Sequence, residues 1–249
     1  MRFRRPPPIE PGDDATLPYE PAEPRPRRRR LAVRLAFWVG KVLAGYYVLC
    51  LLLLVVYRFV PPPATGVGLQ RRLEAWAGGR DLAERREYRP LAEISPHLPR
   101  AVVAAEDGRF WTHHGFDWVE MRRARRDATG GGRVRGASTI TQQLMKNLFG
   151  CACRNPLRKV YDLALTPAAE LILGKRRILE LYLNHVEWGD GVFGAEAAAR
   201  HHYHVGAREL SRTQSAGLAA LLPNPHQRTT GNTPAYRQQI LERMRARGW

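Results

Sequence analysis

Between residues 136 and 149 the chain reads Gly-Ala-Ser-Thr-Ile-Thr-Gln-Gln-Leu-Met-Lys-Asn-Leu-Phe, and upstream of this stretch lies the acid pair Glu106-Asp107. The stretch predicts a helix over Thr139–Leu148 with Ser138 as its N-cap, because a hydroxyl residue precedes apolar positions at helical spacing. An acid pair near a helix that carries amide, hydroxyl and lysine side chains supplies a base and a surface for polyanions. That combination indicates chemistry on a sugar or a phosphate.

The rest of the chain after residue 60 also has the pattern of helices separated by glycine and proline. We predict loops at Gly130–Gly132, Gly189–Gly194 and Pro223–Pro225. Because no convincing run alternates apolar and polar residues, strands should be few and the fold mainly α. Further helices are predicted over Leu69–Trp76, Pro99–Phe110, Leu157–Leu173, Arg177–Val186, Ala195–His202, Glu209–Leu221 and Thr233–Arg247.

An apolar segment near the start of the chain predicts one transmembrane helix, at residues 31–60. Its central part, Ala36–Tyr57, is long enough to cross a bilayer and carries only Lys41 near its beginning. A signal peptide is a poorer match, because the apolar run is longer than a typical h-region. The run also ends in Tyr-Arg-Phe-Val-Pro-Pro-Pro and lacks a small-residue cleavage site. We therefore expect the helix to be retained as an anchor.

The distribution of arginine predicts the orientation of that helix. Arginines are concentrated before it, from Arg25 to Arg34, whereas only Arg58 follows it before Arg71. Because cytoplasmic flanks carry the excess of positive residues, the N-terminus should be cytoplasmic. Residues 1–30, basic and rich in proline, are then a disordered cytoplasmic tail. Residues 61–249 form an extracytoplasmic domain.

Composition fits this plan and limits the partners. The 249 residues leave enough chain beyond the tail and the anchor for one domain with its own core. The net charge of +17 comes mainly from arginine and favours a surface that meets phosphates or an anionic membrane. We expect no nucleic-acid partner, because the anchor places the domain away from the nucleoid and no recognised nucleic-acid motif is found. Cys151 and Cys153, two residues apart, are interpreted as an incidental pair.

Four segments together resemble the ordered motifs of glycosyltransferase family 51. They are Glu106–Asp117 (Glu-Asp-Gly-Arg-Phe-Trp-Thr-His-His-Gly-Phe-Asp), Gly136–Phe149, Arg158-Lys159, and Arg177–Asn184 followed by Gly189 and Gly194. The resemblance covers about residues 61 to 245, in the family's order. No long C-terminal extension with a Ser-x-x-Lys motif follows, so the chain is similar to the monofunctional biosynthetic peptidoglycan transglycosylases.

The resemblance implies a lysozyme-like, two-lobed helical domain with a lobe embedded in the membrane. It also implies an enzyme that polymerises lipid II into glycan strands at the outer face of the bacterial inner membrane and releases undecaprenyl pyrophosphate. Lipid II and the growing glycan chain would be its substrates, and other cell-wall synthesis proteins its possible partners. A divalent metal, Mg²⁺ or Mn²⁺, is the implied cofactor, with Asp162 as the candidate ligand.

The chemistry of such a reaction assigns a role to Glu106. The acceptor sugar's 4-hydroxyl must lose a proton as it attacks an anomeric carbon, so a positioned carboxylate has to act as general base. Inversion from an α-linked pyrophosphate to a β-linkage is consistent with a single displacement. The alternative for Glu106 and Asp107 is that they cap a helix or pair with arginines. One of two adjacent acids on a helix usually points elsewhere, so for Asp107 the catalytic and the structural interpretations both stay open.

The leaving group is a charged pyrophosphate, which needs cations and hydrogen-bond donors. Gln143 and Lys146 are three residues apart and so share one helical face. Asp162 is the second catalytic candidate, acting on the pyrophosphate with Lys146, Arg158 and Lys159. The full set of substrate-binding candidates is Asp107, Phe110, His113, Ser138, Thr139, Gln142, Gln143, Lys146, Asn147, Arg158 and Lys159.

Three positions depart from the family's pattern. Asp162 stands where the pattern Arg-Lys-x-x-Glu has a longer acid, which reaches one methylene further. Gln214 replaces the Glu of a late Leu-Ser-x-x-Glu motif, and His202 replaces an aromatic residue; we expect both to have packing or hydrogen-bonding roles. These departures leave open a catalytically weakened lipid II-binding or scaffold protein. A lytic, glycan-cleaving enzyme, which also uses one glutamate, is a third interpretation.

Overall fold

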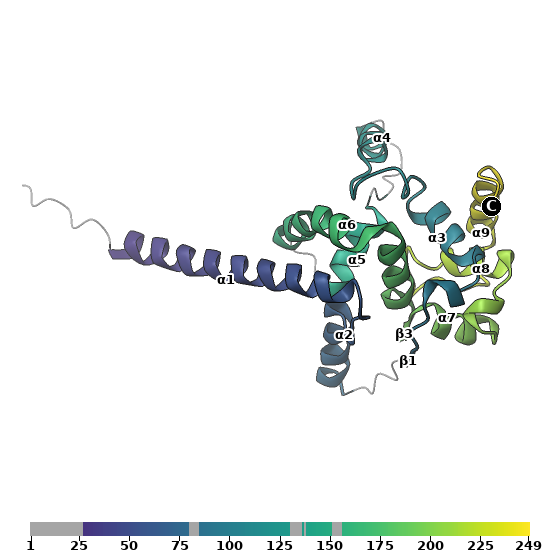
Figure 1. Ribbon diagram of the computed structural model, residues 1–249, viewed down its shortest axis with the longest axis horizontal. Helices are drawn as coiled ribbons and strands as arrows, with labels where there is room; N and C mark the ends of the chain where they lie inside the picture. Colours follow the sequence, from purple (N-terminus) through teal and green to yellow (C-terminus); the bar gives the residue numbers. More distant parts are fainter. Residues whose placement is uncertain (1–26, 80–84, 130–135, 137, 151–155) are drawn as a thin grey trace, which may run out of the picture. The chain divides into compact units, whose positions relative to one another are not determined.

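The computed structural model describes the chain apart from residues 1–26, 80–84, 130–135, 137 and 151–155. The side chains of residues 27–30, 32 and 156–162 also lie outside the description. The described chain is mainly helical, with one small sheet (Figure 1). It divides into two units, residues 1–44 and residues 45–249.

The first unit contains the N-terminal part of α1, a helix that runs over Arg27–Tyr57. The 25 residues Val33–Tyr57 of this helix contain an 18-residue window with a mean hydropathy of 2.3, and the segment is long and apolar enough to cross a membrane. The ammonium of Lys41 lies 4.5 Å from the ring centroid of Phe37 and 5.1 Å from that of Trp38. The aromatic rings therefore accommodate the one lysine within the apolar segment.

The second unit, residues 45–249, builds a helical domain. Its helices are α2 (Gly66–Ala77), α3 (His97–Glu106), α4 (Trp118–Thr129), α5 (Ile140–Phe149), α6 (Pro156–His185), α7 (Ala195–Tyr203), α8 (Arg212–Ala219) and α9 (Pro234–Arg245). Two 3₁₀ turns, η1 (Leu91–Glu93) and η2 (Ala207–Glu209), lie between them. α5 packs on α6, while α3 packs on α8 and α9.

The small sheet has the strand order β1-β3-β2 and pairs a strand that precedes α3 with two strands that follow α6. β2 (Glu187–Gly189) and β3 (Val192–Phe193) are antiparallel, and β1 (Arg85–Arg86) pairs with β3 in parallel. The sequence predicted a loop over Gly189–Gly194, so the hairpin corrects that expectation. Strands of two or three residues are too short to produce a detectable alternation.

α6 contains a break at Gly174, whose φ of 72° and ψ of 160° are not helical. This confirms the prediction of two successive helices, over Leu157–Leu173 and Arg177–Val186. Glycine reaches positive φ without a Cβ clash, which makes Gly174 the point where the two segments change direction. The second segment carries Tyr182 into the fully buried core, with Phe110, Leu144 and Trp188.

Two boundaries and one whole helix also differ from the sequence predictions. α3 ends at Glu106 and not at Phe110, because Asp107 leaves the helical region with φ −151° and ψ 73°. The N-cap of α5 is Thr139, whose hydroxyl accepts from the Gln142 amide, so the assignment to Ser138 was one residue too early. α4 was not predicted, because its arginine-rich sequence buries no residue.

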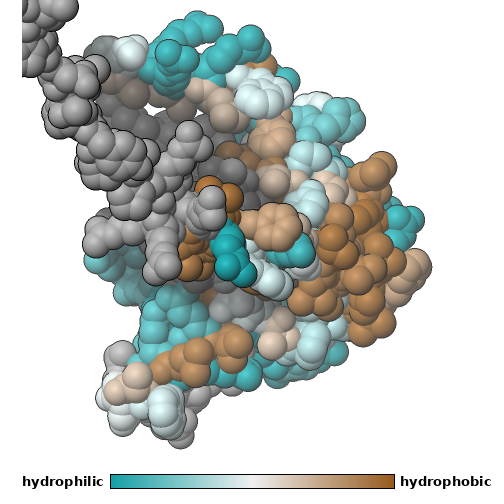
Figure 2. Space-filling view, turned by 90° about the vertical axis from the view of Figure 1, so that its left-hand side faces the viewer, coloured by the Kyte–Doolittle hydropathy of each residue, from teal (hydrophilic) through white to brown (hydrophobic). Residues whose placement is uncertain are grey.

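Several large hydrophobic residues outside α1 are exposed to solvent. They include Leu69, Leu73 and Trp76 on α2, Trp118 and Val119 on α4, and Leu171 on α6. On the face drawn in Figure 2, hydrophobic residues form separate patches between hydrophilic ones. Such patches are typical of proteins that contact a membrane or another protein.

Candidate active site

Glu106 lies at the end of α3, where it faces α5. The side-chain amide of Gln143 donates a hydrogen bond to its Oε2 at 2.9 Å. Burial raises the pKa of Glu106, while the hydrogen bond from Gln143 and the charges of Arg228 and Lys146 oppose that rise. A half-buried carboxylate with a raised pKa and cations nearby has the properties of a general base.

Asp107 points away from Glu106 and ties the end of α3 to the start of α5. Its Oδ2 accepts from the backbone amide of Ile140 at 3.0 Å, and its two carboxylate oxygens lie 2.9 and 3.0 Å from Nε2 of His113. His113 in turn accepts from the amide of Gly115 at Nδ1, 3.1 Å away. The proton on Nε2 therefore faces Asp107, and both side chains are buried. This arrangement fixes the loop that follows Glu106.

The side chains around that loop are also largely engaged with the protein. Phe110 is fully buried, and the ammonium of Lys175 lies 4.4 Å from its ring centroid. The hydroxyl of Thr139 donates to the carbonyl of Gly115 at 2.7 Å. Thr139 and Gln142 form a reciprocal capping box at the start of α5.

The remaining candidates on α5 divide between surface and interior. Ser138 is exposed just before the helix, whereas Asn147 is buried near its end. Lys146 is half-buried on the turn after Gln143 and contributes to the positive field at Glu106. The structure thus brings Glu106, Gln143 and Lys146 together.

Three residues near Glu106 were missed by the sequence analysis: Arg228, Tyr236 and Tyr182. The Arg228 guanidinium lies 5.1 Å from the Tyr236 ring centroid and donates to the carbonyl of Ala220. Burial, and next the charge of Glu106, raise the pKa of Tyr236. Arg228 follows the predicted loop Pro223–Pro225, and only tertiary folding brings that loop to α3.

Arg158, Lys159 and Asp162 lie in the first two turns of α6, and their side chains are outside the described residues. Cys151, Cys153 and the loop Gly130–Gly132 are outside them as well.

The two late departures from the motif pattern have the expected hydrogen-bonding roles. Nε2 of His202 lies 3.1 Å from the carbonyl oxygen of Trp188. Gln214 forms the capping box of α8 with Ser211. Both therefore stabilise local structure.

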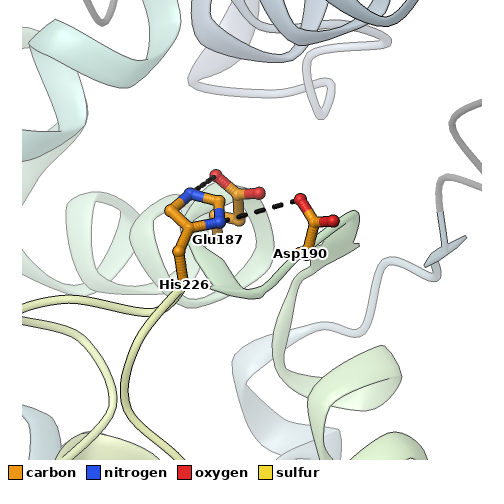
Figure 3. Close-up of side chains that lie close together, drawn as sticks. All are labelled: Glu187, Asp190 and His226. Atoms are coloured by element: carbon orange, nitrogen blue, oxygen red, sulfur yellow. Dashed lines mark ion pairs between the residues drawn. The ribbon is translucent and has the colours of Figure 1, made fainter. Parts of the chain in front are cut away.

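Among the described residues, one group has the spacing of metal ligands: Glu187, Asp190 and His226 (Figure 3). Nε2 of His226 lies 3.4 Å from Glu187 Oε2, and its Nδ1 lies 3.7 Å from Asp190 Oδ1. The guanidinium of Arg71 also contacts both Glu187, at 3.5 Å, and His226, at 2.5 Å. Because a cation is already provided by Arg71, ion pairs explain this cluster and it is a poor fit to a metal ion.

Comparison with known proteins shows which family the chain resembles in sequence. A family model described as Transglycosylase matches residues 74–245. A relative from Pseudomonas fluorescens (strain Pf0-1), named biosynthetic peptidoglycan transglycosylase, is 49% identical over 185 residues, which are 74% of this chain and 77% of the relative.

Two other relatives carry the same name. The one from Ectopseudomonas mendocina (strain ymp) is 46% identical over 84% of this chain and 83% of its own length. The one from Rhodospirillum centenum (strain ATCC 51521 / SW) is 47% identical over 86% of this chain and 91% of its own length. On these matches, this chain belongs to the transglycosylase family.

Proposed function

We propose that the chain is a peptidoglycan glycosyltransferase that polymerises lipid II into β-1,4-linked glycan strands. The observation that carries this proposal is Glu106, a half-buried carboxylate beside Gln143, Lys146 and Arg228. Such a site combines a base for the sugar hydroxyl with positive charge for a phosphorylated donor.

In the proposed reaction Glu106 takes the proton from the 4-hydroxyl of the acceptor sugar. The bond from that oxygen to the anomeric carbon of the donor forms while the bond from the same carbon to the pyrophosphate oxygen breaks. The pyrophosphate leaves with the bonding electrons, and the configuration at carbon inverts. The raised pKa of Glu106 makes its carboxylate a better proton acceptor than an exposed glutamate.

The leaving pyrophosphate is the part of the substrate that requires cations. Lys146 provides one beside Glu106. We propose that Arg158 and Lys159 provide two more and that Asp162 acts beside them. Asp162 would also be the ligand of a divalent metal, which neutralises pyrophosphate charge when bound. The proton transfer to Glu106 does not depend on that ion.

The apolar helix α1 is consistent with a single-pass membrane anchor. We propose that it lies in the bacterial inner membrane with residues 1–30 in the cytoplasm and the catalytic domain outside. This location places the domain where a lipid-linked donor is presented at the membrane surface. Growing glycan is the proposed second substrate.

The experiment that tests the function uses the full chain purified in detergent and labelled lipid II. Polymer that a muramidase degrades would support the transferase. Tight lipid II binding without polymer would support the weakened, binding-only alternative, and restoration of polymer by Asp162→Glu would locate its cause. Release of sugar fragments from finished peptidoglycan would support the lytic alternative.

A metal titration tests the proposed cofactor separately. We expect turnover to fall on removal of divalent ions with EDTA and to recover with Mg²⁺ or Mn²⁺. Unchanged turnover in EDTA would contradict the metal proposal and leave the role of Glu106 intact.

A further inference from the structure

A chain of two hydrogen bonds leads from the buried core to the candidate base. The hydroxyl of Tyr182 donates to Oε1 of Gln143 at 2.8 Å, and Nε2 of Gln143 donates to Oε2 of Glu106 at 2.9 Å. Tyr182 comes from the second segment of α6, Gln143 from α5 and Glu106 from the end of α3. Three elements therefore meet in one line of polar groups.

The protonation state of Tyr182 determines which group donates in each of these two hydrogen bonds. Tyr182 is fully buried, and burial together with the charges of Glu106 and Asp107 raises its pKa far above the ordinary value. Its hydroxyl therefore stays protonated and must donate. The acceptor on Gln143 is then its carbonyl oxygen, which turns the amide nitrogen toward Glu106.

A glutamine side chain without such a partner can present either end to a carboxyl group. Its N–H stabilises an ionised carboxylate, whereas its carbonyl oxygen stabilises a protonated one. From this geometry we infer that Tyr182 is a positioning residue for Glu106, which it keeps ready to accept a proton by fixing the orientation of Gln143. The inference rests on the proposed function for its catalytic meaning.

This role differs from the one the sequence suggested for Gln143, which was contact with the pyrophosphate. Other charged or titratable groups near Glu106 also affect its pKa. They are Asp107 after α3, Lys146 on α5, Arg228 after α8 and Tyr236 on α9. Because a Tyr182→Phe substitution removes one oxygen and leaves these four groups in place, it isolates the contribution of the hydrogen-bond chain.

The test is a titration of Glu106 that does not require turnover. The protonated carboxyl band of Glu106 is identified by infrared difference against Glu106→Gln, in the full chain in detergent, and followed with pH. In Tyr182→Phe we expect the midpoint to move upward by about one pH unit, the size expected for a weakened hydrogen bond to a charged group. On the acid limb of the pH–rate profile, the same shift lowers kcat/KM by about tenfold without changing lipid II affinity.

Two further variants separate positioning from packing. Tyr203→Phe is the matched control, because Tyr203 is a half-buried residue whose buried hydroxyl has no hydrogen-bond partner among the described residues; it should leave the midpoint unchanged. Gln143→Leu should raise the midpoint, and adding Tyr182→Phe to it should change nothing more.

An unshifted midpoint in Tyr182→Phe would overturn the inference. A shift that persists in the Gln143→Leu background would also overturn it, because Tyr182 would then act by another route. If the variants show the expected midpoint shifts but the wild type makes no polymer, the positioning role holds and the proposed transferase fails.

Discussion

At the scale of single residues, the acid pair Glu106-Asp107 divides into two roles. Glu106 ends α3 and faces Gln143, whereas Asp107 is turned into the protein toward His113 and the Ile140 amide. The division arises because the helix ends between the two residues, so their side chains leave the backbone in different directions. Asp107 therefore supports the site by holding the α3–α5 junction.

Replacing Asp107 by Asn should destabilise the domain by about 1–3 kcal/mol, because in either orientation the NH₂ of a buried amide would face an N–H donor, that of His113 or that of Ile140, where the carboxylate offers an acceptor. Chemical unfolding of the full chain measures this loss. Asp190→Asn is the matched control, since the Asp190 side chain is 81% exposed. Equal stability of the two variants would contradict the supporting role.

At the scale of elements, the β2–β3 hairpin and α7 are joined at Gly194. This residue has φ +89°, and a Cβ added to it would lie 2.8 Å from the carbonyl oxygen of Asn184 at the end of α6. The close approach lets α7 start directly beside α6. A side chain at this position would push the two elements apart.

We expect Gly194→Ala to cost about 1–3 kcal/mol in the free energy of unfolding, from the positive φ and the backbone clash together. Gly206→Ala is the control, because Gly206 has φ −72° and the nearest atom to an added Cβ is 3.5 Å away. Thermal unfolding compares the two. A loss no greater than that of the control would show that the contact is relaxed in solution.

At the scale of the whole molecule, the stability of the domain should depend on pH through His185. This residue is buried, and burial and the nearby Arg86 and Arg177 charges lower its pKa from 6.5 to about 3. His185 is neutral in the folded state, so its contribution to the free energy of unfolding is fully present above pH 6.5. It is lost as the pH falls from 6.5 toward 3.

The expected loss at pH 5.5 is about 1.4 kcal/mol, one pH unit below the unfolded pKa. His185→Gln should flatten this part of the unfolding profile, because Gln cannot take up a proton. His114→Gln, at an exposed position, should keep it. Parallel profiles for His185→Gln and the wild type would contradict the assignment.

The orientation of the anchor is the second prediction at this scale. An alkaline phosphatase fused after Trp249 should be active, since this reporter folds only outside the cytoplasm and the arginine distribution predicts an N-terminus inside. An inactive phosphatase, together with fluorescence from a green fluorescent protein fused at the same position, would show that the C-terminus is cytoplasmic and contradict the predicted orientation.

The sequence predicted the helical class, the break near Gly174 and the motif residues, because apolar spacing, glycine and short polar motifs are local signals. The sequence did not predict which other residues these motif residues contact. Gln143 contacts Glu106 and Tyr182, which are far from it along the chain. Arg228 reaches the site from a late loop that has no periodicity. The hairpin β2–β3 was missed because strands of two or three residues are too short to show an alternation of apolar and polar residues.

The role of Glu106 is tested most simply by comparing lipid II polymerisation by the wild type and Glu106→Gln at equal lipid II occupancy. We predict that the variant binds lipid II as well as the wild type and loses about 10²- to 10⁴-fold in kcat, the usual contribution of a general base. Polymer formation at an undiminished rate by Glu106→Gln would show that this carboxylate is not the base.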